Sequence, residues 1–187
     1  MLDLAACSDG ELAALAVGGR QAAYRMLMDR HREAVFRLAR GQTGNNDAAL
    51  EITQHSFIAA FAALKRYDEK RPFRHWIARI ALNKCRDFAR RQKVRQFFSF
   101  ALPIESVETV PDGSIGTLQQ IEAKQELAQA MTEIAQLPQR LREVLVLRTI
   151  EELSQAETAR LLNISEKAAE TRLYRARSLL RERLREA

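Results

Sequence analysis

The sequence predicts an all-α protein made of two small helical domains joined by a linker. Apolar residues recur at three- and four-residue spacing along most of the 187 residues, and no strand-like alternation persists. Only seven glycines and four prolines interrupt these periodic stretches. Because 47% of the residues are apolar, the chain can build real cores, which excludes disorder as its dominant state.

Residues 1–96 form the first predicted domain. Its first helix begins at a capping box formed by Ser8 and Glu11, and its last begins after Pro72, a residue suited to a first helical turn. We expect turns at residues 41–46 and 68–72. The four helices are expected at residues 9–17, 21–40, 47–67 and 73–95. The third should bury its large apolar side chains, Leu50, Phe57, Ile58, Phe61 and Leu64.

Residues 97–119 are predicted to be a linker, because prolines and glycines interrupt any helical period there. Its first part, from Phe97 to Ile104, is apolar enough that we expect it to pack on the first domain or on a partner. The second helical domain then covers residues 120–187.

Charge points to an anionic partner for the first domain. The chain has 30 basic and 24 acidic residues, a net charge of +6. Residues 1–96 hold 18 basic and 10 acidic residues, a balance of +8, whereas the linker carries −3 and the second domain +1. Most of the basic residues are arginines, which suit bidentate contacts with phosphates and base edges.

Several functional classes find no support. Cys7 and Cys85 match no metal or redox spacing, and the three histidines have neither metal-ligand spacing nor a nucleophile partner. We therefore expect no catalytic residue, metal, cofactor or small-molecule substrate. The chain shows no secretory signal and no apolar run of membrane-span length, so we expect a cytoplasmic protein without direct membrane insertion.

A helix-turn-helix is predicted within residues 153–177. Residues 154–157 form a second capping box, residues 163–165 a tight turn, and Ser165 is placed to cap the next helix. Such a unit presents the start of its second helix to a DNA major groove. The inward stripe is expected to contain Ala169, Leu173, Ala176 and Leu180. The outward, DNA-facing residues are Lys167, Ala168, Glu170, Thr171, Arg172 and Arg175.

Aromatic residues alternate with basic ones between residues 67 and 95. Single-stranded nucleic acid needs both a cationic track for its backbone and flat faces or pockets for its bases. At this helical spacing rings such as Phe73, Trp76 and Phe88 are more often part of a core than a stacking platform. The density of basic residues nevertheless favours nucleic acid.

These segments resemble the extracytoplasmic-function (ECF) sigma factors of bacterial RNA polymerase. Residues 54–57 (QHSF), 73–83 (FRHWIARIALN) and 87–91 (DFARR) are similar to region two of that family. Residues 137–148 (LPQRLREVLVLR), 153–159 (LSQAETA) and 171–177 (TRLYRAR) are similar to region four. The two regions occur in the family's order, with a linker between them.

The resemblance implies a promoter-specificity subunit that recruits core RNA polymerase and starts transcription, for a stress or signal response controlled by an anti-sigma factor. It implies that the first domain recognises and melts the minus-ten element, that the 68–72 loop holds a flipped base, and that Trp76 supports strand separation. The residues implied there are Asn83, Arg86, Asp87, Arg90, Arg91, Trp76, Arg74, Asp68 and Lys70.

The resemblance also implies that the outward residues of the second domain read the minus-thirty-five element, and that Glu51, Gln54 and His55 dock on the polymerase. Ala168, Ala169 and Glu170 stand where the family usually has Thr-Val-Lys, so the family's promoter sequence does not transfer directly. A stand-alone regulator would share the helix-turn-helix but would leave the 67–95 pattern unexplained. A helical protein-interaction module without any DNA role is the third class.

Overall fold

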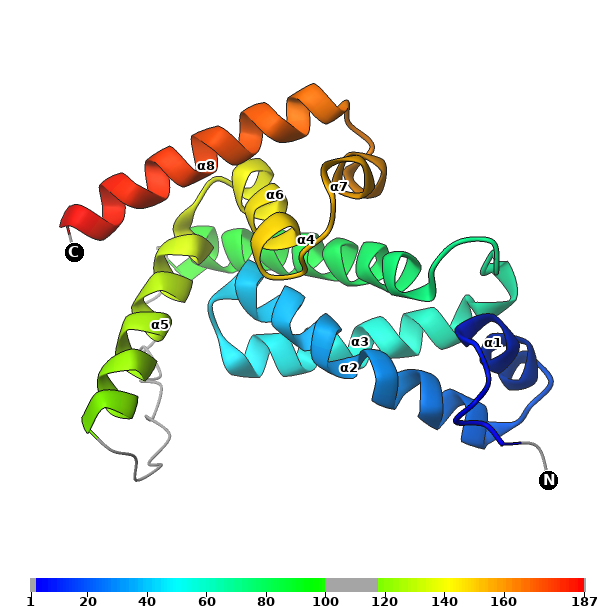
Figure 1. The fold of residues 1–187 in the computed structure, drawn as a ribbon. Coiled ribbons are helices and arrows are strands. Elements are labelled where there is room, and N and C mark those ends of the chain that lie inside the picture. Colours follow the sequence, from blue (N-terminus) through cyan, green and yellow to red (C-terminus); the bar gives the residue numbers. More distant parts are fainter. Residues whose placement is uncertain (1–2, 100–117, 187) are drawn as a thin grey trace.

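The computed structural model describes residues 3–99 and 118–186, and every regular element in these two ranges is helical (Figure 1). This agrees with the all-α prediction. The elements before the gap are α1 (Asp9–Val17), α2 (Gln21–Thr43), α3 (Asn46–Ala62), a short 3-10 turn (Leu64–Arg66) and α4 (Phe73–Ser99). The elements after it are α5 (Leu118–Gln136), α6 (Gln139–Thr149), α7 (Gln155–Leu162) and α8 (Glu166–Glu186).

Helices α2, α3 and α4 form the body of the first domain, with α1 across one end (Figure 1). Their shared core contains Leu27, Leu38, Phe73 and Ile77, each no more than 1% exposed. Leu27 and Leu38 lie on one face of α2, and Phe73 and Ile77 on one face of α4, as expected for amphipathic helices. Burial of a side chain of this size contributes roughly 1.5–3 kcal/mol, so this cluster is a main source of the domain's stability.

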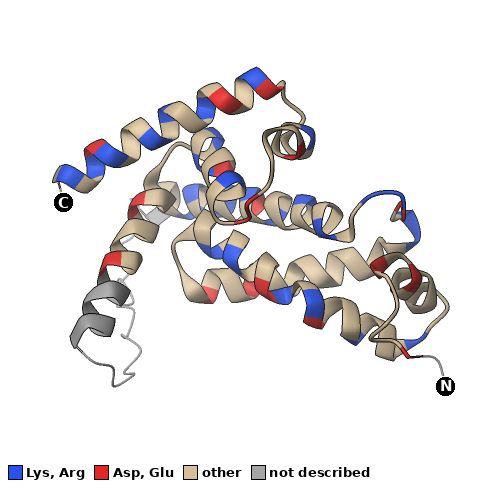
Figure 2. Cartoon of the chain, viewed as in Figure 1, with Lys and Arg blue, Asp and Glu red and all other residues tan. Residues whose placement is uncertain are grey.

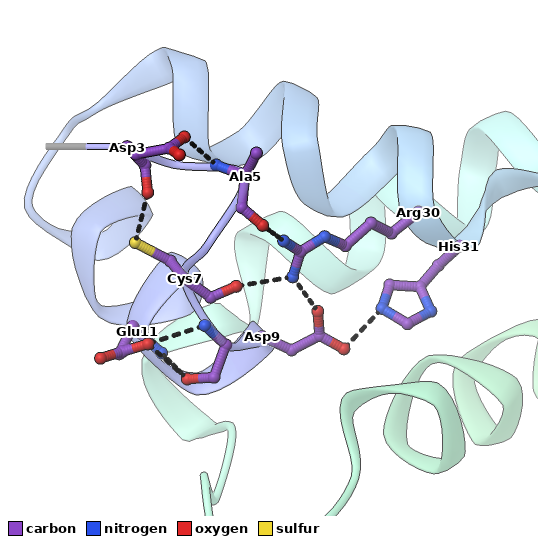
Figure 3. A network of polar contacts seen from close by, with 8 residues as sticks. Asp3, Ala5, Cys7, Asp9, Glu11, Arg30 and His31 are labelled. Carbon is purple, nitrogen blue, oxygen red and sulfur yellow. Dashed lines mark hydrogen bonds and ion pairs between the residues drawn. The ribbon is translucent and has the colours of Figure 1, made fainter.

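The N-terminal segment is tied to α2 by polar contacts (Figure 3). Asp9 accepts a hydrogen bond from Arg30 at 3.0 Å and lies 2.7 Å from the Nε2 atom of His31. Arg30 also donates to the carbonyl oxygens of Ala5 and Cys7, both at 2.8 Å. The predicted capping box at Ser8 is present. These contacts place α1 beside the loop that precedes α4.

Helix α2 is longer than predicted, because the expected turn at residues 41–46 begins only at Gly44. Gly44 adopts a left-handed conformation, with φ at 69°, and ends the helix. Gly41 lies inside the helix, where a Cβ atom would meet the two methyl groups of Val146 on α6 at 3.0 Å. Gly41 therefore permits a close approach between two helices, a role that a sequence pattern cannot distinguish from a turn.

The buried face of α3 also differs from the prediction. Leu50 and Ile58 were expected inside but are 53% and 65% exposed. The residues that face α2 and α4 are mostly small, and they let the helices pack closely: Ala49, Ile52, Ser56, Phe57 and Ala60. The α-helix ends at Ala62. The chain then reaches residue 67, the predicted end of this helix, through the 3-10 turn.

Helix α4 extends to Ser99, three residues beyond the predicted end of the first domain. Phe97 and Phe98 are 79% and 66% exposed, so these two side chains do not pack on the first domain, the first of the two predicted alternatives. Packing on a partner stays a prediction. Most of the predicted linker, including Phe100 and Ile104, lies outside the described residues. The domain boundaries themselves stay a prediction.

The second domain packs directly on the first. Val146 and Leu147 of α6, both fully buried, belong to the same apolar cluster as Leu38 of α2 and Ile77 of α4. Leu153 and Leu161 of the helix-turn-helix join this cluster as well. A second cluster holds α5, α6 and α8 together through Leu137, Leu145 and Ala176. The two predicted domains therefore share part of one core.

We predict that replacing Phe73 by alanine lowers the free energy of unfolding by about 3–5 kcal/mol, because the large ring is almost fully buried and leaves a cavity. Urea denaturation followed by circular dichroism measures the change. Phe97→Ala near the end of α4 is the matched control, because this ring is 79% exposed, and it should shift stability by less than about 0.5 kcal/mol. Equal losses in the two variants would contradict this account of the core.

Candidate nucleic-acid interface

The helix-turn-helix predicted in the second domain is present in α7 and α8. Ser154 and Glu157 form the capping box: the Glu157 amide donates to the Ser154 hydroxyl at 3.2 Å, and the Ser154 amide donates to the Glu157 carboxylate at 2.8 Å. Hydrogen bonds from the side chain and the backbone of Ser154 lower the pKa of Glu157. These contacts fix where α7 begins.

The turn between the two helices depends on two polar residues. Asn163 adopts a left-handed conformation, with φ at 55° and ψ at 52°, which asparagine tolerates better than most residues. Ser165 accepts a hydrogen bond from the Ala168 amide at 3.1 Å and caps α8, as predicted. The short turn orients α8 steeply to α7, so that its first turns project outward (Figure 1).

The faces of α8 agree with the prediction. Ala169 and Ala176 are buried, and Leu173 and Leu180 are half-buried on the inward side. Lys167, Glu170, Thr171 and Arg175 are exposed, whereas Ala168 and Arg172 are half-buried. Basic residues recur along the whole of α8 (Figure 2). The start of this helix therefore presents donors and acceptors of the kind that read base edges and phosphates.

The minus-ten candidates in the first domain lie on α4 and on the loop before it. On α4, Asn83, Arg90 and Arg91 are exposed, and Arg86, Asp87 and Trp76 are half-buried. Arg79, Asn83, Arg86 and Arg90 follow one another at three- or four-residue spacing and so share one side of the helix. The structure therefore brings three of the α4 candidates, Asn83, Arg86 and Arg90, onto one side of the helix together with Arg79.

Trp76 belongs to an aromatic cluster rather than standing alone. Its ring lies 5.3 Å from that of Tyr67 and 5.4 Å from that of Phe73, centroid to centroid. Phe73 and Tyr67 are also in contact, at 5.2 Å. Contacts of this kind contribute about 0.5–1.5 kcal/mol beyond area burial, so the cluster anchors the 68–72 loop to α4.

The 68–72 loop borders an open cleft of about 640 Å³ between α1 and the start of α4. Asp68 accepts a hydrogen bond from the Lys70 amide at 3.1 Å, and Tyr67 donates to the Arg71 carbonyl oxygen at 2.7 Å. Lys70 and Arg71 line the cleft together with Asp9. These hydrogen bonds give the loop a defined shape. The cleft beside it is lined by side chains of both signs, basic Lys70 and Arg71 and acidic Asp9.

The docking candidates lie together on the outer face of α3. Glu51, Gln54 and His55 are all exposed, with the Nδ1 atom of His55 3.7 Å from Glu51. Leu50 and Ile58, which the packing of α3 leaves outside, lie on the same helix and are more than half exposed. The result is a mixed apolar and polar helix face of the kind that suits a protein partner.

Contacts between the two domains were not predicted. Arg86 on α4 donates from Nε and Nη2 to the two carboxylate oxygens of Glu143 on α6, both at 2.7 Å. Arg74 donates to the carbonyl oxygen of Glu151 and lies 3.4 Å from its carboxylate. Arg79 donates to the Arg160 carbonyl oxygen at 2.8 Å.

No local pattern could have revealed these pairs, because the partners are 57 to 81 residues apart. Two of the arginines, Arg74 and Arg86, are minus-ten candidates. His75 also faces the second domain, 3.4 Å from Glu157, and burial lowers the pKa of this histidine while the carboxylate opposes the shift.

Comparison with known proteins identifies the two domains. The family model for Sigma-70 region 2 matches residues 27–95, and the model for Sigma-70, region 4, matches residues 127–180. The RNA polymerase sigma factor CnrH of Cupriavidus metallidurans is 39% identical over 176 residues, 92% of each chain. Sigma factor NccH of Alcaligenes xylosoxydans is 37% identical over 172 residues, again 92% of each.

Solved structures agree with this assignment. The structure of CnrH in complex with the cytosolic domain of CnrY has a TM-score of 0.69 and 33% sequence identity, and the match covers 95% of this chain and 97% of that one. The fold thus defines a two-domain sigma factor of RNA polymerase, a transcription-initiation factor rather than a class of catalytic enzyme. More narrowly, the chain belongs to the ECF sigma factors: the ECF sigma factor SigM of Mycobacterium tuberculosis is 30% identical over 173 residues, which cover 92% of this chain and 83% of SigM.

Within residues 3–99 and 118–186, no helix combines the length and apolarity that crossing a membrane requires. The same part of the chain has no cluster of three or more His, Cys, Asp or Glu side chains that could bind a metal ion.

We predict that Ser154→Ala lowers the free energy of unfolding by about 1 kcal/mol, because α7 loses its capping acceptor. Ser154→Asp retains an acceptor at the same position and should remain within a few tenths of a kcal/mol of the wild type. Thermal unfolding of both variants measures the difference. If the aspartate variant loses as much stability as the alanine variant, the cap is not the cause.

Proposed function

We propose that the two basic helices divide promoter recognition between them, with α4 binding the melted minus-ten element and α8 reading the minus-thirty-five duplex. The observation that carries this proposal is the presence, in one sigma-factor chain, of a basic α4 surface with an aromatic cluster at its start and a capped helix-turn-helix. The α4 surface supplies a cationic track beside a cleft for an unstacked base. The helix-turn-helix supplies the start of a helix for a major groove.

We assign contact with the minus-ten element to those residues of α4 and of the preceding loop that the sequence predicts for this role. Asn83 and Arg90 are exposed on the middle of the helix, where they can reach bases and phosphates. The cleft beside Lys70 suits a flipped base, with Asp68 holding the loop in shape. Trp76, packed against Tyr67 and Phe73, forms a stiff edge for strand separation.

On α3, we assign polymerase docking to the exposed face that carries Glu51, Gln54 and His55. The exposed Leu50 and Ile58 support this proposal, because their burial against a partner would supply the apolar contribution that the charged residues lack. The linker would then span the two promoter-binding domains along the polymerase surface.

We further propose that this sigma factor acts in the cytoplasm, in a stress or signal response, and that an anti-sigma factor controls it. The solved relative CnrH was captured with the cytosolic domain of CnrY. A structure with the same fold, sigma factor RpoE of Bartonella quintana, holds the anti-sigma factor NepR. Both complexes support a protein partner of this kind for the present chain.

In vitro transcription tests the proposal. With purified core RNA polymerase and the promoter upstream of the chain's own gene, the wild type should produce a start-site-specific transcript. Asn83→Ala combined with Arg90→Ala should reduce it by at least about tenfold, since two direct strand contacts are lost. Arg32→Ala, an exposed arginine of α2, is the matched control and should transcribe normally.

If the wild type neither binds core polymerase nor directs any transcript across a genomic promoter library, the assignment of α4 and α8 to the two promoter elements is wrong. Binding to duplex DNA in the absence of polymerase would then favour a stand-alone regulator.

On α8, the base-facing and phosphate-facing roles predict different phenotypes. Glu170→Ala should relax base preference at one position of the minus-thirty-five element, with about 1–3 kcal/mol less discrimination. Arg175→Ala should weaken binding evenly across sequences and reduce the slope of log affinity against log salt by about one. Holoenzyme binding to a library of minus-thirty-five variants at several salt concentrations separates the two. An even loss for Glu170→Ala would show that it does not read a base.

A further inference from the structure

A cavity of about 460 Å³ lies where α7 meets the start of α4. The 68–72 loop and α4 supply one wall, and α7 with the turn after it supplies the other. It is separate from the cleft assigned to a flipped base, because only Arg71 and Pro72 border both. Small ligands bind preferentially in hollows of about 300–1,000 Å³ at domain interfaces, so this cavity is a candidate binding site.

Three arginines give the cavity its positive charge. Arg71 and Arg79 line it from the first domain and Arg160 from the second, and all three are exposed. Arg79 donates one hydrogen bond to the Arg160 carbonyl oxygen at 2.8 Å, and the Nε atom of Arg160 donates to Ala156 at 3.3 Å. The Nε atom of Arg71 lies 3.4 Å from Asp68. Because a guanidinium group carries five N–H donors, each arginine retains donors for an anionic ligand.

Trp76 supplies a flat apolar wall. The ring is half-buried and is held by Tyr67 and Phe73, with centroids 5.3 and 5.4 Å away. Leu161 of α7 adds apolar surface to the same cavity. An aromatic ring that its neighbours hold in place is a suitable surface on which a flat heterocycle can stack.

His75 and Glu157 add hydrogen-bonding groups from the two walls. They lie 3.4 Å apart, and Glu157 is fixed at the start of α7 by the Ser154 amide at 2.8 Å. Burial lowers the pKa of His75 against the opposing effect of Glu157, which favours the neutral imidazole with one donor and one acceptor. Among the described residues that line the cavity, arginines outnumber this one carboxylate by two. A phosphate or diphosphate balances that excess better than a single carboxylate does.

We propose that this cavity binds a nucleoside phosphate, with the base stacked on Trp76 and the phosphate groups held by the three arginines. His75 and Glu157 then face the hydrogen-bonding edges of the base or the ribose. The inference goes beyond the promoter role of the chain and does not depend on it. A ligand that contacts both walls also stabilises the packing of α7 against α4, because it binds only where the two walls face each other.

The fluorescence of Trp76 tests the proposal directly, because it is the only tryptophan in the 187 residues. Titration of the full chain with ADP, CDP, GDP and UDP, each in turn, should give saturable quenching by at least one of them, with a Kd below about 1 mM. The nucleoside and inorganic pyrophosphate, the two halves of that ligand, should each bind at least about tenfold more weakly. The proposal is overturned if none of the four diphosphates quenches saturably. Pyrophosphate that binds as tightly as the nucleotide would contradict the role of the base.

Variants of one arginine from each wall locate the site. Arg71→Ala and Arg160→Ala should each weaken nucleotide binding by at least about tenfold, because a charge-assisted contact with phosphate is lost. The bond from Arg79 to the backbone of residue 160 is kept in the second variant. Arg66→Ala and Arg140→Ala remove the same charge from exposed positions outside the cavity and should bind like the wild type. Equal losses in these controls would assign binding to net charge and refute the site.

Thermal unfolding distinguishes binding from collisional quenching. The nucleotide should raise the Tm of the wild type and of both controls, but should raise that of Arg160→Ala much less at the same concentration. Quenching without any rise in Tm would show that the nucleotide meets Trp76 without binding the folded cavity, and the proposal would fail. Neither measurement involves polymerase or DNA, so its outcome is independent of the transcription experiment.

Discussion

The close packing of α6 against α2 at Gly41 is the contact on which the arrangement of the two domains depends. Because this position has no Cβ, Val146 and Leu147 can enter the apolar cluster of the first domain and become fully buried. That burial orients α6 so that Glu143 reaches Arg86 and Glu151 reaches Arg74. The ion pairs are thus a consequence of the apolar contact, and the near-complete burial of the two glutamates makes the pairs sensitive to its loss.

Two arginines of α4 contact carboxylates of the second domain: Arg86 donates to Glu143, and Arg74 lies 3.4 Å from the carboxylate of Glu151. Arg86 is placed on the helix by the same spacing that places Asn83 and Arg90, so the three side chains share one side of α4. On this side of α4 the carboxylate of Glu143 from the second domain is paired with Arg86.

The outer face of α3 illustrates how close packing also creates a binding surface. Small residues such as Ala49 and Ala60 occupy the interior because three helices meet there with little space between them. Leu50 and Ile58 are then left on the outside beside Glu51, Gln54 and His55. An exposed leucine and isoleucine on a helix that also carries polar docking candidates is unfavourable in water and favourable against a partner.

The sequence by itself determined the helical class, the order of the elements, both capping boxes, the helix-turn-helix and the family, because these follow from local spacing and from motifs within short stretches. Tertiary structure alone decided that α2 continues through Gly41, that Leu50 and Ile58 face outward, and that Glu143 pairs with Arg86. Each of these depends on which distant helix packs against the residue. Local periodicity records that a side chain is apolar or charged, but the free energy of its burial or pairing is set by neighbours far away in the chain.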